Sequence, residues 1–116
     1  MNKKQKVLIT GSNGLLGQKI VYSLKQRKDV DLYATALGVN RLIDKSGYTY
    51  HSLDITDKNQ VYKVLDKVKP DTIINTAAMT NVDACELNKQ QCWDINVAAV
   101  KFLVDASVNR NTHFIH

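Results

Sequence analysis

The sequence predicts an α/β fold, a doubly wound parallel sheet with helices on both of its faces. Short apolar and β-branched runs without polar alternation are typical of strands that are buried on both sides. Segments with apolar residues at helical spacing separate most of these runs, as in β-α-β units. The predicted order is β-α-β-β-α-β-α-β, and 116 residues are enough for one domain.

Glycines at positions 11, 14 and 17 separate the first predicted strand from the first predicted helix. The strand is the run Lys-Val-Leu-Ile-Thr at 6–10, and the helix is predicted over 15–28. The apolar positions of this helix recur at a period near 3.6 residues: Leu16, Ile20, Val21 and Leu24.

The middle of the chain predicts two strands and a helix. The strands are expected at 31–37 and 48–53, with a loop between them. Thr56 or Asp57 can cap the helix that follows, and Pro70 ends it. The apolar positions of the helix have the spacing i, i+3, i+4 and i+7: Val61, Val64, Leu65 and Val68.

The last third of the chain predicts a strand at 71–76, a long helical region over 83–110 and a further strand at 112–116. Trp93 is expected to be a packing residue of the helical region. The expected inner face of the region consists of Ile95, Val100, Leu103 and Val104.

Composition and charge exclude several classes of protein. With 44% hydrophobic and 23% charged residues, the chain is ordinary for a globular domain. No apolar run approaches the roughly 20 residues that span a bilayer, and no signal peptide is recognised, so we expect a cytoplasmic protein without a membrane partner. The net charge of +5 comes largely from lysine and arginine clusters at 3–6 and 25–28 without interleaved aromatic residues, so no nucleic-acid partner is expected.

The two cysteines, Cys85 and Cys92, are seven residues apart in the predicted helical region. Two helical turns separate such residues by about 10 Å along the axis, so we predict reduced thiols without a disulfide. Neither the cysteines nor the histidines have the spacing of a metal site, and no metal is predicted; the histidines are His51, His113 and His116.

The glycine spacing at 11–17 is typical of a loop that binds a dinucleotide, because it follows a buried strand and opens a helix. Gly11 would allow the tight turn, Gly14 the approach of the backbone to a pyrophosphate, and Gly17 the close packing of helix and strand. The partial positive charge of the helix N-terminus favours an anion there. A plain structural turn is the alternative, and Gln18 after Gly17 excludes a P-loop.

The second strand ends in Thr-Ala-Leu-Gly, without the acidic residue that binds the ribose 2′-hydroxyl of NAD, and Arg41 follows it. An arginine in this region accommodates the 2′-phosphate of NADP. This pattern favours NADP as the cofactor and leaves NAD as the alternative. Arg41 as a merely solvated loop residue is the competing interpretation.

Four segments in order carry a family resemblance: ITGSNGLLGQKI, SLDITD, KPDTIINTAAMTNVDACE and WDINVAAVKFLVDAS. With them the sequence resembles the N-terminal part of the extended short-chain dehydrogenases, and within that family the dTDP-4-dehydrorhamnose reductases. The resemblance covers essentially all 116 residues. It implies a Rossmann-type fold that is truncated after the fifth strand.

The resemblance also implies roles for individual residues around a nicotinamide cofactor. The crevice beyond the carboxyl ends of parallel strands suits such a ligand. Two alternatives stay open: Asp54 could serve only as a helix cap, and the two alanines at 77–78 could serve only in tight packing. The implied residues are Gly11, Asn13, Gly14, Leu15 and Leu16 at the pyrophosphate, Asp54 and Ile55 at the adenine, Ala77 and Ala78 at the ribose, Thr80 on the nicotinamide side, and Asn96 as a hydrogen-bonding support of the active site.

In the family, a serine or threonine polarises a sugar carbonyl, the tyrosine of a Tyr-x-x-x-Lys pair donates a proton, and the cofactor delivers hydride. No tyrosine of this sequence has a lysine four residues later, so no catalytic residue is assigned. The resemblance therefore implies that residues 1–116 are the NAD(P)-binding part of a longer reductase, without the catalytic segment and the substrate domain. We expect the fifth strand to be an exposed sheet edge.

The implied activity is reduction of the 4-keto group of a nucleotide-activated deoxysugar, so the partner of the full-length protein would be a nucleotide-sugar substrate. We expect the 116 residues alone to bind the cofactor without turnover, and a homo-oligomer is compatible with this interpretation. Two alternatives stay open. One is a non-catalytic NADP-binding subunit similar to the regulatory beta subunit of methionine adenosyltransferase, and the other is a nucleotide-sugar epimerase or dehydratase.

Overall fold

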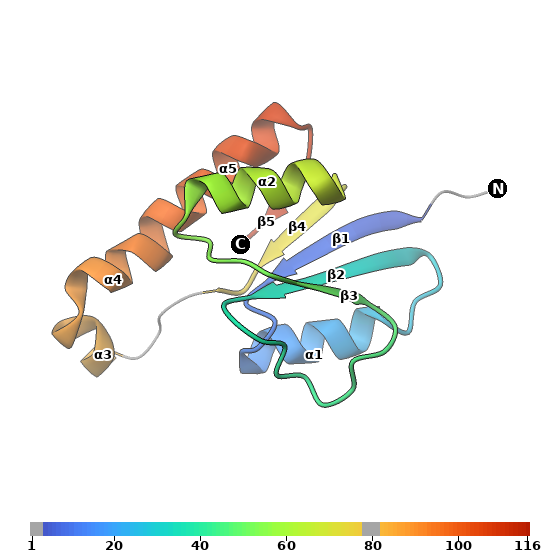
Figure 1. Cartoon of the computed structure of the whole chain (residues 1–116), viewed down its shortest axis with the longest axis horizontal. Helices are drawn as coiled ribbons and strands as arrows, with labels where there is room; N and C mark the ends of the chain where they lie inside the picture. The colour runs from blue at the N-terminus through green and yellow to red at the C-terminus, as the bar shows by residue number, and fades with distance from the viewer. Residues whose placement is uncertain (1–3, 78–81) are drawn as a thin grey trace.

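A computed structural model describes residues 4–77 and 82–116, with the side chains of 82–84 left aside, and contains a five-stranded sheet (Figure 1). All strand pairs are parallel, which confirms the predicted fold class. The strand order in the sheet is β3-β2-β1-β4-β5, so β3 and β5 are its edges. The strands are β1 Gln5–Thr10, β2 Val30–Ala36, β3 Thr49–Ser52, β4 Thr72–Asn75 and β5 His113–Ile115.

The helices cover both faces of the sheet. Figure 1 shows α1 on one face and α2 with α5 on the other, while α3 and α4 extend beyond the carboxyl ends of the strands. The helices are α1 Leu15–Leu24, α2 Lys58–Val68, α3 Val82–Leu87, α4 Lys89–Trp93, the π-helical turn η1 Asp94–Ala98 and α5 Ala99–Asn109.

The hydrophobic core has two parts, one on each face of the sheet. Successive side chains of a strand point to opposite faces, so Leu8 of β1 belongs to one part and Val7 and Ile9 to the other. This two-sided burial explains why β1 lacks polar alternation. The part under α2 and α5 contains Leu53, Val61, Leu65, Val68, Ile73, Leu103 and Ala106, and the part under α1 contains Val21, Leu32, Ala34 and Leu42.

The order of the strands changes direction at β1. From β1 the chain proceeds to β2 and β3 on one side, and then crosses to β4 on the other side, so β1 lies between β2 and β4. Thr10 at the end of β1 is accordingly paired with Thr35 of β2 and Asn75 of β4. At such a switch point the connections after two neighbouring strands diverge and leave a crevice, which is where parallel sheets bind ligands.

The predicted helix at 83–110 is divided in the structure, and part of its predicted inner face is wrong. Asn88 separates α3 from α4, and the π-helical turn η1 precedes α5. A π-turn inserts an extra residue, which rotates the helix face that meets the sheet. Val104 is therefore exposed, and the buried residues of α5 are Ala99, Leu103, Ala106 and Ser107.

The predicted cap of α2 is confirmed at Asp57. Its side chain accepts hydrogen bonds from the backbone amides of Asn59 (3.0 Å) and Gln60 (3.3 Å), and the Gln60 amide group donates to Asp57 Oδ2 at 3.1 Å. At the other end, Lys69 adopts a left-handed conformation and its N–H donates to Leu65 O before Pro70 ends the helix.

We expect Asp57→Ala to lower the free energy of unfolding by about 1 kcal/mol, because two amides of the first turn lose their acceptor. Urea denaturation at neutral pH measures the loss. Asn59→Ala is the matched control, since Asn59 contributes its backbone amide to the cap and its side chain is exposed. Equal losses in the two variants would contradict the capping role.

Candidate functional site

A pocket of about 500 Å³ lies at the carboxyl ends of four strands, at the switch point of the sheet. Its floor comes from the residues that follow β1, β2, β3 and β4, so segments far apart in the sequence meet there. One wall comes from α4 and η1. The strand ends contribute Gly11, Thr35, Ala36, Leu37, Leu53, Thr56, Thr76 and Ala77 among other residues, and the wall contributes Gln91, Asp94 and Ile95.

Seven of the twelve residues assigned to cofactor binding line this pocket: Gly11, Asn13, Gly14, Arg41, Asp54, Ile55 and Ala77. Leu15 and Leu16 lie outside the lining, in the first turn of α1, with exposed side chains. Asn96 lies in a different, shallower hollow beside α3 and α4. Ala78 and Thr80 fall outside the described residues, so their assignments stay predictions.

Packing within the protein explains two of the three glycines. Gly11 has φ +75°, and a Cβ there would lie 2.6 Å from the backbone nitrogen of Ala77. A Cβ at Gly17 would collide with the carbonyl oxygen of Gly11 and would lie 2.8 Å from the carbonyl carbon of that residue. Gly11 therefore permits both the turn and the approach to β4, and Gly17 brings α1 against the turn. The sequence predicts Leu16 on the inner face of α1, but its side chain is exposed.

Gly14 is different, because the protein itself does not exclude a side chain there. A Cβ at Gly14 would meet only the carbonyl oxygen of Gly11 among the described atoms, at 3.4 Å, and its φ of −77° suits any residue. Gly14 is the N-cap of α1 and lines the pocket. The first amides of a helix have no acceptor inside the helix, so an anion above Gly14 would meet unpaired N–H groups.

Asp54 lines the pocket and is not the cap of α2. Its Oδ1 atom accepts hydrogen bonds from the backbone amide of Thr56 (3.0 Å) and from Thr56 Oγ1 (2.6 Å), while Asp57 caps the helix. The alternative that Asp54 serves only as the helix cap is therefore wrong. These bonds fix the carboxylate just after β3, where it lines the pocket.

Arg41 lines the pocket from the segment between β2 and β3. Its side chain is exposed and has no ion-pair partner within residues 4–77 and 82–116. The end of β2 contributes Thr35, Ala36 and Leu37 to the same pocket, none of them acidic. This part of the pocket is thus suited to an anionic group.

Neighbouring side chains hold the segment that carries Arg41. The Tyr50 hydroxyl lies within hydrogen-bonding distance of the carbonyl oxygens of Ala36 (3.0 Å) and Gly38 (2.7 Å), and burial raises the pKa of this phenol. A hydrogen bond from the Lys25 ammonium, with further bonds from Ser46, holds the pKa of the Asp44 carboxyl well below its usual range. At neutral pH Tyr50 is therefore a donor and Asp44 is an anion.

The wall residues Gln91, Asp94 and Ile95 are functional candidates that the sequence pattern does not indicate. The pattern predicts a core position for Ile95 and no role for the other two. Their spacing of i, i+3 and i+4 places them on one helical face, which is a usable signal. The spacing alone does not say which surface the three residues meet. In the structure they line the same pocket as the glycine-rich turn.

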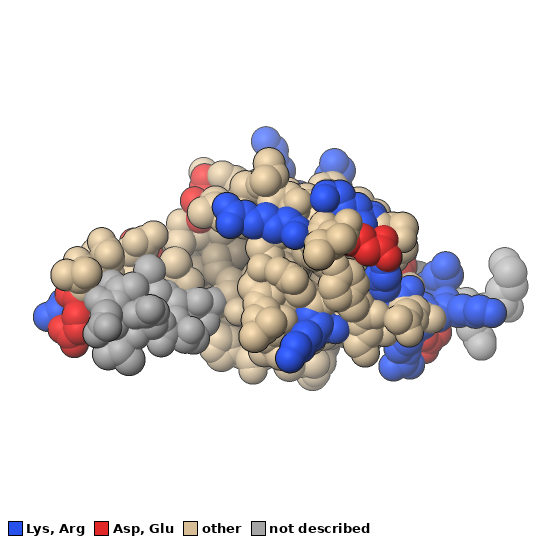
Figure 2. Space-filling view, turned by 90° about the horizontal axis from the view of Figure 1, so that it is seen from below, with Lys and Arg blue, Asp and Glu red and all other residues tan. Residues whose placement is uncertain are grey.

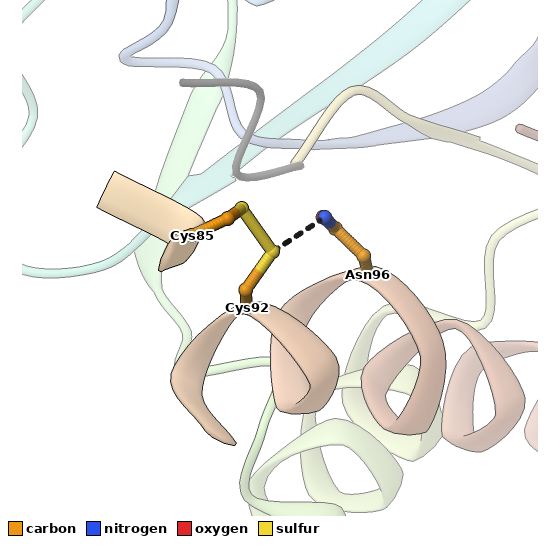
Figure 3. The surroundings of a disulfide bond; sticks show 3 residues. All are labelled: Cys85, Cys92 and Asn96. Atoms are coloured by element: carbon orange, nitrogen blue, oxygen red, sulfur yellow. Dashed lines mark hydrogen bonds between the residues drawn. A yellow bond between two sulfur atoms is a disulfide. The ribbon is translucent and has the colours of Figure 1, made fainter. Parts of the chain in front are cut away.

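The prediction of two separate thiols is wrong: Cys85 and Cys92 form a disulfide (Figure 3). Their Cα atoms are 5.3 Å apart, because the chain turns at Asn88 and folds α3 back toward α4. A continuous helix would have kept them about 10 Å apart. Figure 3 also shows Asn96 Nδ2 donating to Cys92 Sγ, at 3.3 Å. Trp93, which the sequence predicts to be a packing residue, is 59% exposed and lines the shallow hollow that also contains Asn96 and the two cysteines.

Basic side chains gather toward one end of the molecule. Seen from the side of α1, Lys and Arg lie most densely at the end where β1 begins, opposite α3 and α4 (Figure 2). Among the described residues, no three His, Cys, Asp or Glu side chains are grouped to hold a metal. Within the same residues, no helix has the length and apolar character that a membrane crossing requires.

A family model described as the RmlD substrate binding domain matches residues 5–116. A dTDP-4-dehydrorhamnose reductase of Aggregatibacter actinomycetemcomitans is 32% identical over 111 residues, and a probable low-salt glycan biosynthesis reductase of Haloferax volcanii is 33% identical over 108 residues. The matches cover 96% and 93% of this chain but 33% and 35% of the relatives. The chain therefore spans about a third of the length of these curated relatives.

Solved structures also match this chain over about a third of their own length. A dTDP-4-dehydrorhamnose reductase of Bacillus anthracis in complex with NADP has a TM-score of 0.77 and 31% identity. The match covers 96% of this chain and 35% of the reductase chain. A hypothetical dTDP-4-dehydrorhamnose reductase of Sulfolobus tokodaii has a TM-score of 0.79 and 33% identity, over 97% of this chain and 38% of its own. A Thermus thermophilus UDP-glucose 4-epimerase in complex with NAD shares the fold, with a TM-score of 0.83 and 20% identity. The match covers 93% of this chain and 35% of the epimerase chain.

The two glycine environments predict opposite responses to a single methyl group. Gly17→Ala should lower the free energy of unfolding by about 3 kcal/mol or more, because the new Cβ collides with backbone. Gly14→Ala should change it by less than about 1 kcal/mol, since the conformation is open to any residue. Urea denaturation of both variants beside the wild type measures the contrast. A comparable loss at Gly14 would show that packing, and not a ligand, requires glycine there.

Proposed function

Because the chain belongs to the RmlD substrate binding domain family, we propose that residues 1–116 form the dinucleotide-binding part of a nucleotide-sugar oxidoreductase. The observation that carries this proposal is Gly14. It lines the pocket at the N-terminus of a ten-residue helix, and nothing within the described protein requires the absence of its side chain. A ligand that lies against the backbone there explains the glycine.

The residues present suit the pyrophosphate of a nicotinamide dinucleotide. Gly11 and Gly14 would let the phosphates approach the backbone, and Asn13 lies between them. The first-turn amides of Leu15 and Leu16, whose side chains point away into solvent, would donate to the phosphate oxygens. This assigns Leu15 and Leu16 to the cofactor site through their backbones and not through their side chains.

We assign the rest of the cofactor to residues at the ends of the other strands. Asp54 and Ile55 at the end of β3 would lie at the adenine, and Ala77 after β4 would lie beneath the ribose with Ala78. We assign Thr80 to the nicotinamide side. Asn96, which bonds to Cys92 in the adjoining hollow, is assigned a supporting role near the active site.

We propose that the cofactor is NADP. The end of β2 brings no carboxylate to the pocket, and Arg41 lines the pocket without an ion-pair partner among the described residues. A guanidinium pairs well with a phosphate through charge-assisted hydrogen bonds. The Bacillus anthracis relative in complex with NADP is consistent with this choice.

For the whole protein we propose reduction of the 4-keto group of a deoxysugar nucleotide, as the name of the Aggregatibacter relative implies. The cofactor, when bound, would supply the hydride. Residues 1–116 contain no Tyr-x-x-x-Lys pair, which supports assigning them the cofactor site and not the proton donor. We therefore propose that this chain binds the dinucleotide without turning over a substrate.

We expect Gly14→Val to weaken NADP binding by about tenfold or more, because the branched side chain would occupy the position of the pyrophosphate. Isothermal titration calorimetry of the variant and the wild type measures the two dissociation constants. Thermal unfolding of both proteins verifies that the variant is folded. An unchanged dissociation constant in the folded variant would refute the assignment of this loop.

Arg41→Ala should weaken binding of NADP by about tenfold and leave binding of NAD within about threefold, since only NADP carries the 2′-phosphate. The readout is the ratio of the two dissociation constants in the variant and in the wild type. Lys45→Ala is a matched control, because it removes a cation from the same segment but from outside the pocket lining. Equal weakening of both dinucleotides in Arg41→Ala would contradict the role of Arg41.

A further inference from the structure

The segment from residue 37 to 48, between β2 and β3, contains no helix or strand but is fixed at its far end. The Tyr22 hydroxyl accepts hydrogen bonds from the backbone amides of Ile43 (3.1 Å) and Asp44 (3.4 Å). Lys25 Nζ donates to Asp44 Oδ2 at 2.6 Å and to Ser46 O at 3.0 Å. Leu42 is fully buried under α1. The far half of the segment is therefore held against α1.

The near half of this segment, which carries Arg41, is held by Asn13 of the glycine-rich turn. Asn13 Nδ2 donates to Val39 O at 2.9 Å, and Asn13 Oδ1 accepts from the Arg41 backbone amide at 2.8 Å. The carbonyl oxygen of Asn13 in turn accepts from Gln18 Nε2 of α1, at 2.7 Å. One side chain thus joins the two loops that border the pocket, and the two hydrogen bonds to the segment lie within two residues of Arg41.

The chemistry of these two bonds requires a primary amide. The side chain of asparagine offers a donor and an acceptor on one short planar group, which matches a carbonyl at 39 and an N–H at 41. Aspartate has nearly the same shape but offers acceptors only, so it would keep the bond to Arg41 and oppose the carbonyl of Val39. Alanine would lose both bonds.

We propose that Asn13 is a positioning residue that sets the preference for a 2′-phosphorylated dinucleotide by fixing the backbone beneath Arg41. This inference rests on the proposed function. It adds to the role of the Arg41 guanidinium a role for the Asn13 side chain, which holds the backbone of that segment in place. A backbone that is already fixed at Arg41 does not have to be ordered when the ligand arrives, whereas a free segment does. Removing Asn13 should therefore reduce the benefit of the 2′-phosphate more than the binding of the rest of the dinucleotide.

The test is a double-mutant cycle on the full 116-residue chain, with NADP and NAD as the probes. Calorimetric titration gives the ratio of the two dissociation constants for the wild type, Asn13→Ala, Arg41→Ala and the double variant. We expect Asn13→Ala to reduce the preference for NADP over NAD by about tenfold, because any effect at the shared pyrophosphate weakens both dinucleotides alike and cancels in the ratio. In the Arg41→Ala background, Asn13→Ala should leave the ratio unchanged, because Arg41→Ala keeps the backbone amide but removes the guanidinium.

Two further variants keep the test decisive. Asn13→Asp preserves the volume of the side chain and should also lower the preference, so it replaces the alanine variant if that one fails to fold. Ser46→Ala removes a hydroxyl that bonds to Asp44 at the far end of the segment, and should leave the ratio unchanged.

The outcomes separate the inference from the proposal beneath it. A wild type that binds neither dinucleotide, or that prefers NAD, overturns the proposed cofactor and this inference together. A wild type that prefers NADP, with an unchanged ratio in both Asn13 variants, overturns the inference alone. Equal weakening of NADP and NAD by Asn13→Ala, or an additive effect in the double variant, would make Asn13 a direct ligand or a structural residue and would also overturn it.

Discussion

The structure depends on a very close approach between the β1–α1 turn, the end of β4 and the first turn of α1. Gly11 leaves no room for a side chain beside Ala77, and Gly17 leaves none beside Gly11. These two contacts fix where α1 begins and which way its N-terminus points. The same contacts hold the diverging connections after β1 and β4 in place, so the crevice at the switch point is formed by the backbone itself. Gly14 then adds to this crevice a position that the protein leaves open.

Around this rigid centre, anion recognition is divided between two loops. The glycine-rich turn presents helix amides, and the segment after β2 presents Arg41. The side chain of Asn13 connects them, while Tyr22, Lys25 and Leu42 hold the far end of the segment to α1. A loop without regular structure is thereby held in one arrangement by side-chain hydrogen bonds and one buried leucine. Preorganisation of this kind reduces the ordering that a ligand would otherwise have to impose.

The wall formed by α4 and η1 shows how local breaks in a helix shape a site. A continuous helix would have presented one stripe of residues to the core and kept the cysteines apart. The turn at Asn88 brings Cys85 to Cys92, and the π-helical turn rotates α5 relative to α4. As a result Gln91, Asp94 and Ile95 face the pocket, whereas Trp93 faces the adjoining hollow. The match to the family model, over residues 5–116, includes α3, α4 and η1.

The sequence by itself determined the fold class, the order of the strands along the chain and the family, because each of these depends on pattern: two-sided apolar runs, helical spacing and ordered motifs. It restricted the cap of α2 to Thr56 or Asp57, and the structure selected Asp57. The glycine spacing, Arg41 and the family resemblance together indicated seven residues that line the pocket, and the resemblance alone supplied Asn13, Asp54, Ile55 and Ala77. Only the tertiary structure decided which side chains meet across the carboxyl edge of the sheet. The Asn13 side chain reaches the backbone amide of Arg41, and beyond that edge the two cysteines join. Such contacts arise between segments whose separation is set by turns and helix breaks, and neither composition nor periodicity records where a chain bends back on itself.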